Sequence, residues 1–484
     1  MSDFRTAYPQ YAATSLLDDL RATEYGYLDE AGHVYLDYTG AGLPSRAQLR
    51  VHASRVYGNC YGNPHSQNPT SAASTLLVEH ARRAVLRFFG TTADEYAVIF
   101  TPNATGACRL VGEAYPFHRS SRFVLTTDNH NSVNGIREFA RAGGARVTYV
   151  PLTRPELRVT EADLDRALDP GHGARTGLFA YPAQSNFSGV RHPLRWVSRA
   201  RDAGYDVLLD AAAFVPTSRL DLAVVRPEFV SVSWYKVFGY PTGVGCLLAR
   251  QDALTRLRRP WFSGGTVRGA SVRYDWHRLL EGEAGYEDGT ANYLSIPDVT
   301  TGLDWISGVG LELITLRVSI LTNWLVESLG RLKHGNGAPM ARIYGPVTSI
   351  GRGACVAFNF LDPSGRPVDE RIVARDATAA GISLRTGHFS NPGAAEVALG
   401  TGETALGTGE AAPRAGGQHA AGAVRASFGV ASTLGDVEAF LDFAERTYRS
   451  RATPGWVLPH APPPRPHACR AADSGTSVPI LGAC

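Results

Sequence analysis

Six short apolar runs between residues 95 and 250 alternate with stretches of helical pattern, and this alternation constrains the fold more than any other feature. The runs read AVIF, FVLTT, RVTYVPL, GLFAYP, DVLLDAAA and FVSVSW. Strands that alternate with helices are typical of βαβ units, which build a mainly parallel sheet. We therefore expect an α/β fold that binds its ligand at the carboxyl ends of the strands.

Polar residues follow the apolar runs at the places where such a ligand should bind. The segment Asn103 to Thr105, which includes Ala104, comes after AVIF and can open a helix with free backbone N–H groups. His130 follows FVLTT, Asn186 follows GLFAYP, and Asp210 ends the run VLLD. Each residue alone is explained by a helix cap, a turn or a buried loop. Together, at successive strand ends, they predict one binding site.

Lys236 lies in the stretch FVSVSWYKVFGYPTGVGCLLAR, which predicts strand, turn and strand with the lysine at the turn. Only two of the 48 basic residues are lysines, Lys236 and Lys333. Arginine is never deprotonated in a protein, whereas a desolvated lysine serves as nucleophile or base. Lys333 is interpreted as a surface lysine near a helix end, and Lys236 as a functional amine.

These residues match the needs of pyridoxal 5'-phosphate. The cofactor requires a lysine amine, a carboxylate at its ring nitrogen, and phosphate donors at a helix start, and a flat group over the ring is useful. Lys236, Asp210 and His130 supply the amine, the carboxylate and the flat group, and are the predicted catalytic residues. Asn103 to Thr105 and Ser233 are the predicted phosphate donors, and Tyr235 is a further predicted cofactor contact.

Several motifs resemble the class V aminotransferase superfamily of fold type I, specifically the amino-terminal domain of molybdenum cofactor sulfurases and the related cysteine desulfurases. The motifs are YLDYTGAGL, YGNPHSQN, YPAQSNFSGVRHPL, LLDAAAFVPT, SWYKVFGYPTGVG, SGGTV and EDGTANYLSI. The similarity runs from about residue 35 to 296 and resumes from 381 to 429. It implies a large domain with a mainly parallel seven-stranded sheet flanked by helices, and a small α+β domain.

The resemblance also implies a homodimer with shared active sites and assigns further residues. Thr266 is expected to bind the phosphate held by the neighbouring subunit, and Asn186 to lie near the cofactor 3-hydroxyl or the substrate. Arg425 is expected to bind the substrate α-carboxylate, because an arginine fork suits a carboxylate, and Arg385 is a second candidate.

One departure from the family concerns sulfur chemistry. Cysteine desulfurases and cofactor sulfurases carry a catalytic cysteine in a segment that here reads LRTGHFSNPGAA. Ser390 and Ala395 stand where thiols would be, and serine cannot carry a persulfide. We expect His388 and Ser390 to contact the substrate instead, and we do not expect desulfuration of free cysteine.

The predicted reaction is β-elimination from a cysteine S-conjugate, which yields a thiol, pyruvate and ammonia with Lys236 as the base. Three alternatives stay open: decarboxylation-coupled oxidative deamination of an S-substituted cysteine, transamination, and a non-catalytic scaffold. Relatives in bacterial antibiotic pathways suggest a role in secondary metabolism. The substrate is thus expected to be a small amino acid.

The predicted domains are a 1–34 segment joining the small domain, a 35–300 large domain, a 301–453 small domain and a 454–484 proline-rich tail. A Gly/Ala-rich insertion is expected at about 396–423, either as a lid or as a surface loop. Residues 25–38 predict a hairpin that turns at 30–32. The six cysteines lack zinc-ligand spacing, and Cys108 and Cys246 are interpreted as core residues.

Composition is that of an ordinary globular protein. The net charge of +3 comes from scattered arginines, and 44% of residues are hydrophobic, so neither nucleic acid nor a membrane is an expected partner. No signal-peptide pattern opens the chain, and we expect a cytoplasmic location.

Overall fold

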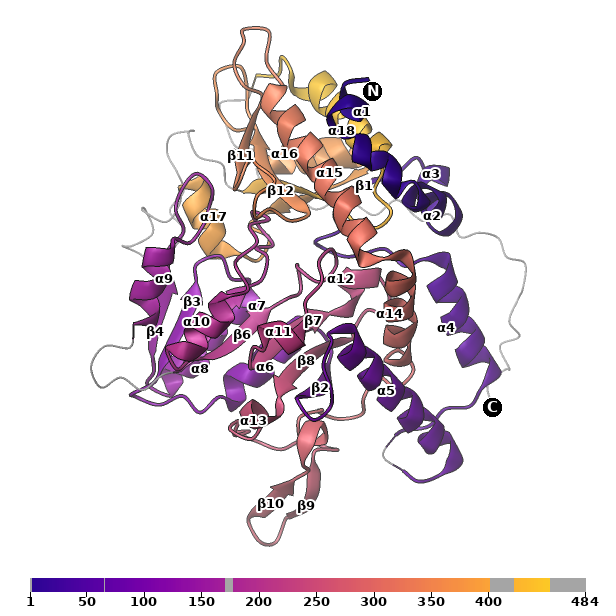
Figure 1. Cartoon of the computed structure of the whole chain (residues 1–484), viewed down its shortest axis with the longest axis vertical. Helices are drawn as coiled ribbons and strands as arrows, with labels where there is room; N and C mark the ends of the chain where they lie inside the picture. Colours follow the sequence, from indigo (N-terminus) through magenta and orange to yellow (C-terminus); the bar gives the residue numbers. More distant parts are fainter. Residues whose placement is uncertain (1, 65, 170–176, 401–421, 453–484) are drawn as a thin grey trace, which may run out of the picture. The chain divides into compact units, whose positions relative to one another are not determined.

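A computed structural model describes residues 2–64, 66–169, 177–400 and 422–452 (Figure 1). Most of the predicted insertion, residues 401–421, and the whole predicted tail, residues 454–484, lie outside the described residues.

A seven-stranded sheet contains all six predicted runs and one further strand. In spatial order its strands are β2 (Tyr96–Thr101), β8 (Gly245–Arg250), β7 (Phe229–Ser233), β6 (Asp206–Asp210), β5 (Leu178–Pro182), β3 (Arg122–Thr126) and β4 (Arg146–Val150). Strand β8 is antiparallel to both of its neighbours, and the other neighbouring pairs are parallel. The expected mainly parallel α/β sheet is confirmed.

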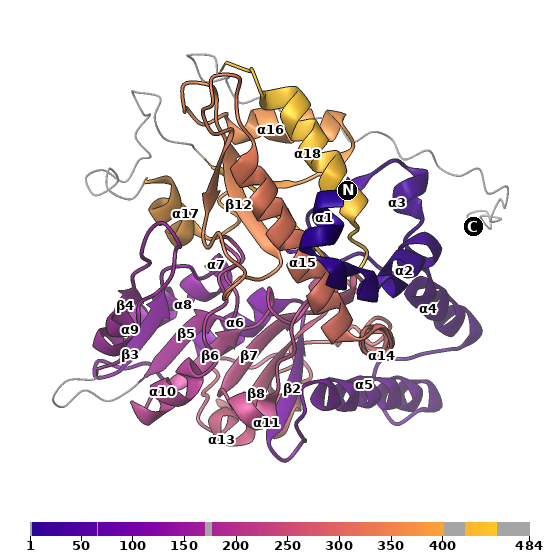
Figure 2. The same cartoon turned by 45° about the horizontal axis from the view of Figure 1, so that its top comes forward.

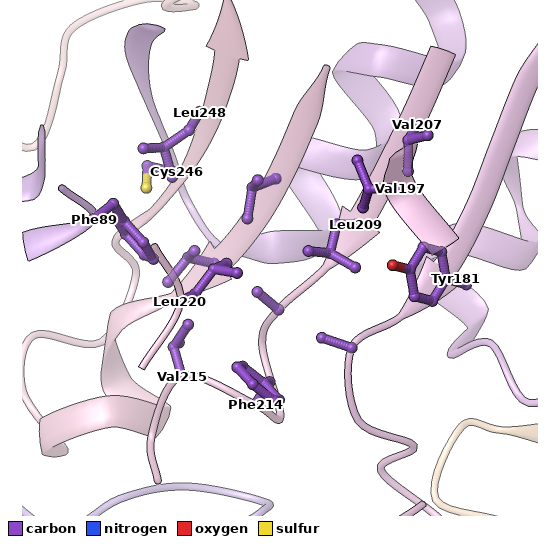
Figure 3. Close-up of a cluster of buried hydrophobic side chains, with 14 of the residues drawn as sticks. Phe89, Tyr181, Val197, Val207, Leu209, Phe214, Val215, Leu220, Cys246 and Leu248 are labelled. Atoms are coloured by element: carbon purple, nitrogen blue, oxygen red, sulfur yellow. The ribbon is translucent and has the colours of Figure 1, made fainter. Parts of the chain in front are cut away.

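Both faces of this sheet are apolar, because alternate side chains of each strand enter different cores. Along β2, Val98 and Phe100 join one buried cluster, whereas Ala97 and Ile99 join another. The first core is covered by helices α5 (Pro69–Phe88), α9 (Glu161–Leu168), α10 (Trp196–Asp202) and α14 (Pro297–Val309). The second is covered by α6 (Ala104–Ala114), α7 (Asn131–Asn134), α8 (Ile136–Ala142) and α13 (Gln251–Leu254). Figure 3 shows part of the first core, and Cys108 and Cys246 are buried as predicted.

A third core forms around a four-stranded antiparallel sheet. Its strands, in spatial order, are β11 (Ala341–Tyr344), β12 (Cys355–Phe360), β15 (Ala423–Ser427) and β14 (Arg385–Gly387). Helices α15 (Leu311–Arg331), α16 (Glu370–Ala379) and α18 (Leu434–Tyr448) pack on this core (Figure 2). Leu17 of α2 (Leu16–Glu24) and Leu28 of α3 (Tyr27–Glu30) enter the same core, so the N-terminal segment packs there. The predicted domain boundaries themselves stay predictions.

The predicted hairpin at residues 25–38 is wrong. Residues Tyr27–Glu30 are helical, and the short strand β1 (Val34–Tyr35) pairs in parallel with β13 (Ile382–Ser383). Apolar alternation identified a strand, but the strand's partner lies far away in the sequence, where local pattern cannot reveal it. The turn that holds Lys236 is also more regular than predicted, since it forms the short helix α12 (Trp234–Phe238).

The predicted insertion is shorter than expected at both ends. Helix α17 (Pro392–Leu399) is capped by Asn391 and includes residues 396–399, and Ala423 already belongs to β15. Helix α4 (Arg46–Gly58) begins after a capping box formed by Ser45 and Gln48. Among the described residues, no single helix is long and apolar enough to span a membrane, and α14 with α15 reach those limits only as a pair bent by 70°.

Candidate active site

A cavity of about 290 Å³ lies where strands β2, β5, β6 and β7 end. Most of the predicted cofactor contacts line it: Asn103, Ala104, Thr105, His130, Asn186, Asp210, Ser233, Tyr235 and Lys236. Further residues line it to which the sequence analysis assigned no role, among them Ser132, Gln184, Thr242 and Gly243. The prediction that strand ends converge on one site is therefore met by the geometry.

Lys236 reaches the cavity from the middle of α12, whose first turn follows directly from the end of β7. Within the described part of the chain, its Nζ forms neither a hydrogen bond nor an ion pair. Burial lowers the pKa of Lys236, and the positive charges of Arg425 and Arg385 lower it further, while Asp210 acts in the opposite direction. The amine is thus easier to deprotonate than an ordinary lysine, as a nucleophile or base requires.

Asp210 ends β6 and is 8% exposed. Its Oδ1 accepts hydrogen bonds from the Ser231 hydroxyl at 3.0 Å and the Ala212 amide at 3.1 Å. Oδ2 has no hydrogen-bond partner among the residues that the structure describes, so it is available to a ligand. A buried carboxylate with one unused oxygen is suited to the N–H of a pyridinium ring.

The start of helix α6 forms a polar corner of the cavity. Asn103 caps this helix by accepting the Gly106 amide at 3.0 Å, and the Ala104 amide donates to the Ser233 hydroxyl at 2.9 Å. The hydroxyls of Thr105 and Ser132 are 2.7 Å apart. Helix N-termini favour anions, and three hydroxyls beside one such terminus suit a phosphate group.

His130 lies between β3 and α7 and lines the cavity. Its Nδ1 accepts the backbone amide of Ser132 at 3.1 Å, which leaves the proton of the neutral ring on Nε2. Burial lowers the pKa of His130, and the positive charge of Lys236 lowers it further. The ring is therefore a neutral, flat surface, as a stacking partner for an aromatic cofactor should be.

The two predicted carboxylate anchors meet at a residue that the sequence prediction missed. Asp37 Oδ2 is 2.5 Å from Arg385 Nη2, and its Oδ1 is 3.1 Å from Arg425 Nη2. Arg425 also donates to the carbonyl of Asn186, which lines the cavity, at 2.8 Å. Asp37 stands in the quoted motif YLDYTGAGL, where a carboxylate just before a Gly-rich turn was the available signal.

The segment from His388 to Asn391 lies against the cavity wall. The Asn186 amide donates to the Phe389 carbonyl at 2.8 Å, and the Asn131 backbone N–H donates to the Ser390 carbonyl at 2.7 Å. Phe389 and Ser390 have φ values of 55° and 54°, a left-handed conformation that is unusual for these residues. His388 and Ser390 are exposed, so both side chains are accessible.

Thr266 does not line the cavity of its own chain. It is buried, and its hydroxyl donates to the Ser263 carbonyl at 2.8 Å. Because the predicted phosphate contact belongs to a second copy of the chain, this role stays a prediction.

Comparison with known proteins identifies the family. The family described as aminotransferase class-V matches residues 34–440. The chain belongs to this class-V aminotransferase family. Its similarity to human molybdenum cofactor sulfurase is 37% identity over 92% of the chain, and to the tomato (Solanum lycopersicum) molybdenum cofactor sulfurase 34% over 93%. These alignments cover 53% and 59% of the relatives, so the chain spans somewhat more than half of their length.

Solved structures show the same fold at lower identity. The cysteine desulfurase of Thermococcus onnurineus is 24% identical, with a TM-score of 0.75 over 89% of this chain and 97% of that protein. The class-V fold is also shared with a C-DES variant that carries glycine covalently linked to its PLP cofactor, at 18% identity and a TM-score of 0.68 over 88% and 99% of the two chains. The chain is thus a class-V enzyme of PLP fold type I.

Pyridoxal phosphate is the cofactor of this class-V enzyme. The donor set in the cavity fits it, because a partner-free lysine amine, an unused carboxylate oxygen and a polar helix start line the same space. Lys236 would hold the cofactor, Asp210 would bind its ring nitrogen, and Asn103 to Thr105 with Ser233 would hold its phosphate.

Proposed function

We propose that this class-V enzyme is a C–S β-lyase that cleaves an S-substituted cysteine into a thiol, pyruvate and ammonia. The observation that carries the proposal is the loop from His388 to Asn391, which contacts the cavity-lining Asn186 and carries Ser390 but no thiol. Among the described cysteines none lines the cavity: Cys60 is exposed elsewhere, and Cys108, Cys246 and Cys355 are buried. Elimination needs no enzyme nucleophile at sulfur, whereas persulfide transfer does.

The chain's own groups have separate tasks in this reaction. Arg425 and Arg385 bind the α-carboxylate, and His130 and the polar helix start fix the cofactor. The cofactor, when bound, supplies an electron sink for bond breaking at the Cα atom of the amino acid. Lys236 is the base that removes the Cα proton, because its lowered pKa favours the free amine.

The bond changes balance without an oxidant. Lys236 Nζ takes the Cα proton, the remaining electron pair forms the Cα–Cβ double bond, and the Cβ–S bond breaks. The sulfur leaves with its electron pair as a thiolate. Hydrolysis of the released aminoacrylate by one water yields pyruvate and ammonia.

We further propose that the enzyme is a cytoplasmic homodimer of bacterial secondary metabolism, with two shared active sites. Support for a dimer comes from apolar side chains on the hairpin of β9 (Val267–Ser271) and β10 (Trp276–Leu279). Val272, Tyr274 and Trp276 there are 107%, 62% and 53% exposed. A cluster of exposed large apolar residues is typical of a protein interface.

The test is to incubate the holoenzyme with S-methyl-L-cysteine and, separately, with free L-cysteine, and to identify products by mass spectrometry with a thiol trap. Methanethiol and pyruvate in equal amounts are the expected products of S-methyl-L-cysteine. Alanine from free cysteine would mean sulfur transfer and would contradict the proposal. Carbon dioxide with retained sulfur, or a sulfur-containing keto acid, would instead establish decarboxylation or transamination.

The variant Ser390→Cys sharpens the test. If the missing thiol is what separates this enzyme from desulfurases, this variant should gain alanine formation from free cysteine, whereas a Ser198→Cys control, exposed on α10 and outside the cavity lining, should not.

A further inference from the structure

Asp37 joins three distant segments of the chain around one carboxylate. It follows strand β1, while Arg385 is on β14 and Arg425 is on β15. The side chains of Asp37, Arg425 and Arg385 are 11%, 3% and 48% exposed. The cluster therefore has a buried member, Arg425, and a half-exposed member, Arg385, that share one counterion.

The register of the small sheet explains why a counterion is needed. Arg385 and Arg425 are directly opposite each other in the antiparallel pair of β14 and β15. Like charges in directly opposite positions repel: burial lowers the pKa of Arg425, and the positive charge of Arg385 lowers it further. Asp37 offsets one of the two positive charges, and the trio keeps one excess positive charge.

The backbone around Asp37 is shaped to hold this arrangement. The amides of Gly40 and Ala41 donate to the Asp37 carbonyl at 2.9 and 3.1 Å, so the chain turns tightly there. A Cβ atom on Gly40 would lie 2.4 Å from Arg385 Nη2 and 2.6 Å from Asp37 Oδ2. Glycine at this position lets Arg385 close over the carboxylate.

Arg425 has capacity left for a ligand. Its Nη1 and Nη2 donate to Asn186 and Asp37, but its buried Nε has no partner within the described ranges. Its guanidinium also lies 4.9 Å from the centre of the Phe389 ring, in the loop beside the cavity. Neither arginine lines the cavity itself, so a carboxylate held between the cavity and this trio would meet its one uncompensated positive charge first at the half-exposed Arg385.

We propose that Asp37 determines headgroup specificity by setting the charge of the arginine pair. With one excess positive charge, the site takes a monoanionic carboxylate and discriminates against a dianionic headgroup such as a phosphonate. This inference rests on the proposed amino-acid substrate, but it does not depend on which bond is later broken.

The test uses two ligands that differ in headgroup charge, L-alanine and (1-aminoethyl)phosphonic acid. Dissociation constants are measured from the absorbance change of the bound cofactor at pH 8. In Asp37→Asn the excess positive charge of the trio rises from one to two. Binding of the phosphonate should therefore be strengthened about tenfold relative to binding of alanine. Asp37→Glu, which keeps the charge, should retain the wild-type ratio.

A matched control changes an aspartate that pairs with an arginine outside the site. Asp18 is 2.7 Å from Arg317, and Asp18→Asn should leave the ratio unchanged. An unchanged ratio in Asp37→Asn would overturn the inference, as would equal weakening of both ligands in a variant with a normal melting curve. Neither ligand contains sulfur, so failure of the C–S lyase proposal appears only in the product assay, and failure of this inference only in the ratio.

Discussion

Two regions of the molecule are built in different ways. One is the lysine edge, which we define as Lys236 and Asp210 at the end of the large sheet, and the other is the arginine pair, Arg385 and Arg425, on the small sheet. Lys236 and Asp210 follow neighbouring parallel strands, and each is positioned by the strand that precedes it. Asp37 instead meets Arg385 and Arg425 across 348 and 388 residues of sequence. The first region holds the groups that bind cofactor, and the second holds the groups that we expect to bind the amino acid.

Because the two regions are positioned by different parts of the fold, mutations should affect cofactor chemistry and substrate recognition separately. The lysine edge rests on the core of the seven-stranded sheet, whereas the arginine pair rests on contacts between segments that only tertiary folding unites. Changes in one region should therefore leave the other measurable.

The largest expected effect is at the lysine edge. Lys236→Ala removes the only amine in the cavity lining, so the visible band of the bound cofactor should disappear. Turnover should fall by about 10³- to 10⁴-fold, as for loss of a positioned base. Absorbance spectra and product assays test this, with Lys333→Ala as the control, because Lys333 is exposed and outside the cavity. If the Lys236→Ala enzyme kept its visible band and its turnover, the assignment of Lys236 as the cofactor-binding amine and base would be wrong.

The next effect is at the arginine pair, and it should spare the cofactor. Arg425→Met removes a buried, charge-assisted donor and should weaken amino-acid binding about 100-fold. Arg385→Met removes a half-exposed, screened charge and should weaken it about tenfold. Titration with alanine measures both, and cofactor affinity serves as the internal control. The opposite order would make Arg385 the principal anchor.

The smallest effect links the two regions through charge. Cofactor loading requires the neutral Lys236 amine, and burial lowers the pKa of Lys236. The loading rate should therefore reach half of its plateau at a pH below about 10.4, the ordinary pKa of lysine. Arg385 lowers this pKa through its positive charge. Arg385→Met should therefore stabilise the ammonium and move the midpoint upward. Stopped-flow absorbance of the apoprotein with cofactor across pH measures the midpoint, and a downward shift would contradict the assignment.

Local pattern predicted the lysine edge well. Apolar runs such as FVSVSW became strands because their side chains enter cores on both faces, and parallel strands end at the same edge. Asp210 and Lys236 could then be placed together from their positions after two runs. The rarity of lysine marked Lys236 in addition.

The arginine pair shows where local pattern stops. Arg385 and Arg425 were predicted from a family resemblance, but the sequence around these arginines does not indicate that Asp37 is their shared counterion. The wrong hairpin at residues 25–38 has the same origin, since β1 pairs with β13 instead of a neighbour in sequence.

The parallel sheet, the cofactor and the residues at the strand ends could be predicted from the sequence, because hydrophobic periodicity and side-chain chemistry are local properties. Three features required the folded chain: Asp37 lies between two arginines, Ser390 is exposed in a loop that contacts the cavity-lining Asn186, and β1 pairs with β13. Such contacts depend on which distant segments pack together, and that choice is made by the energy of the whole fold.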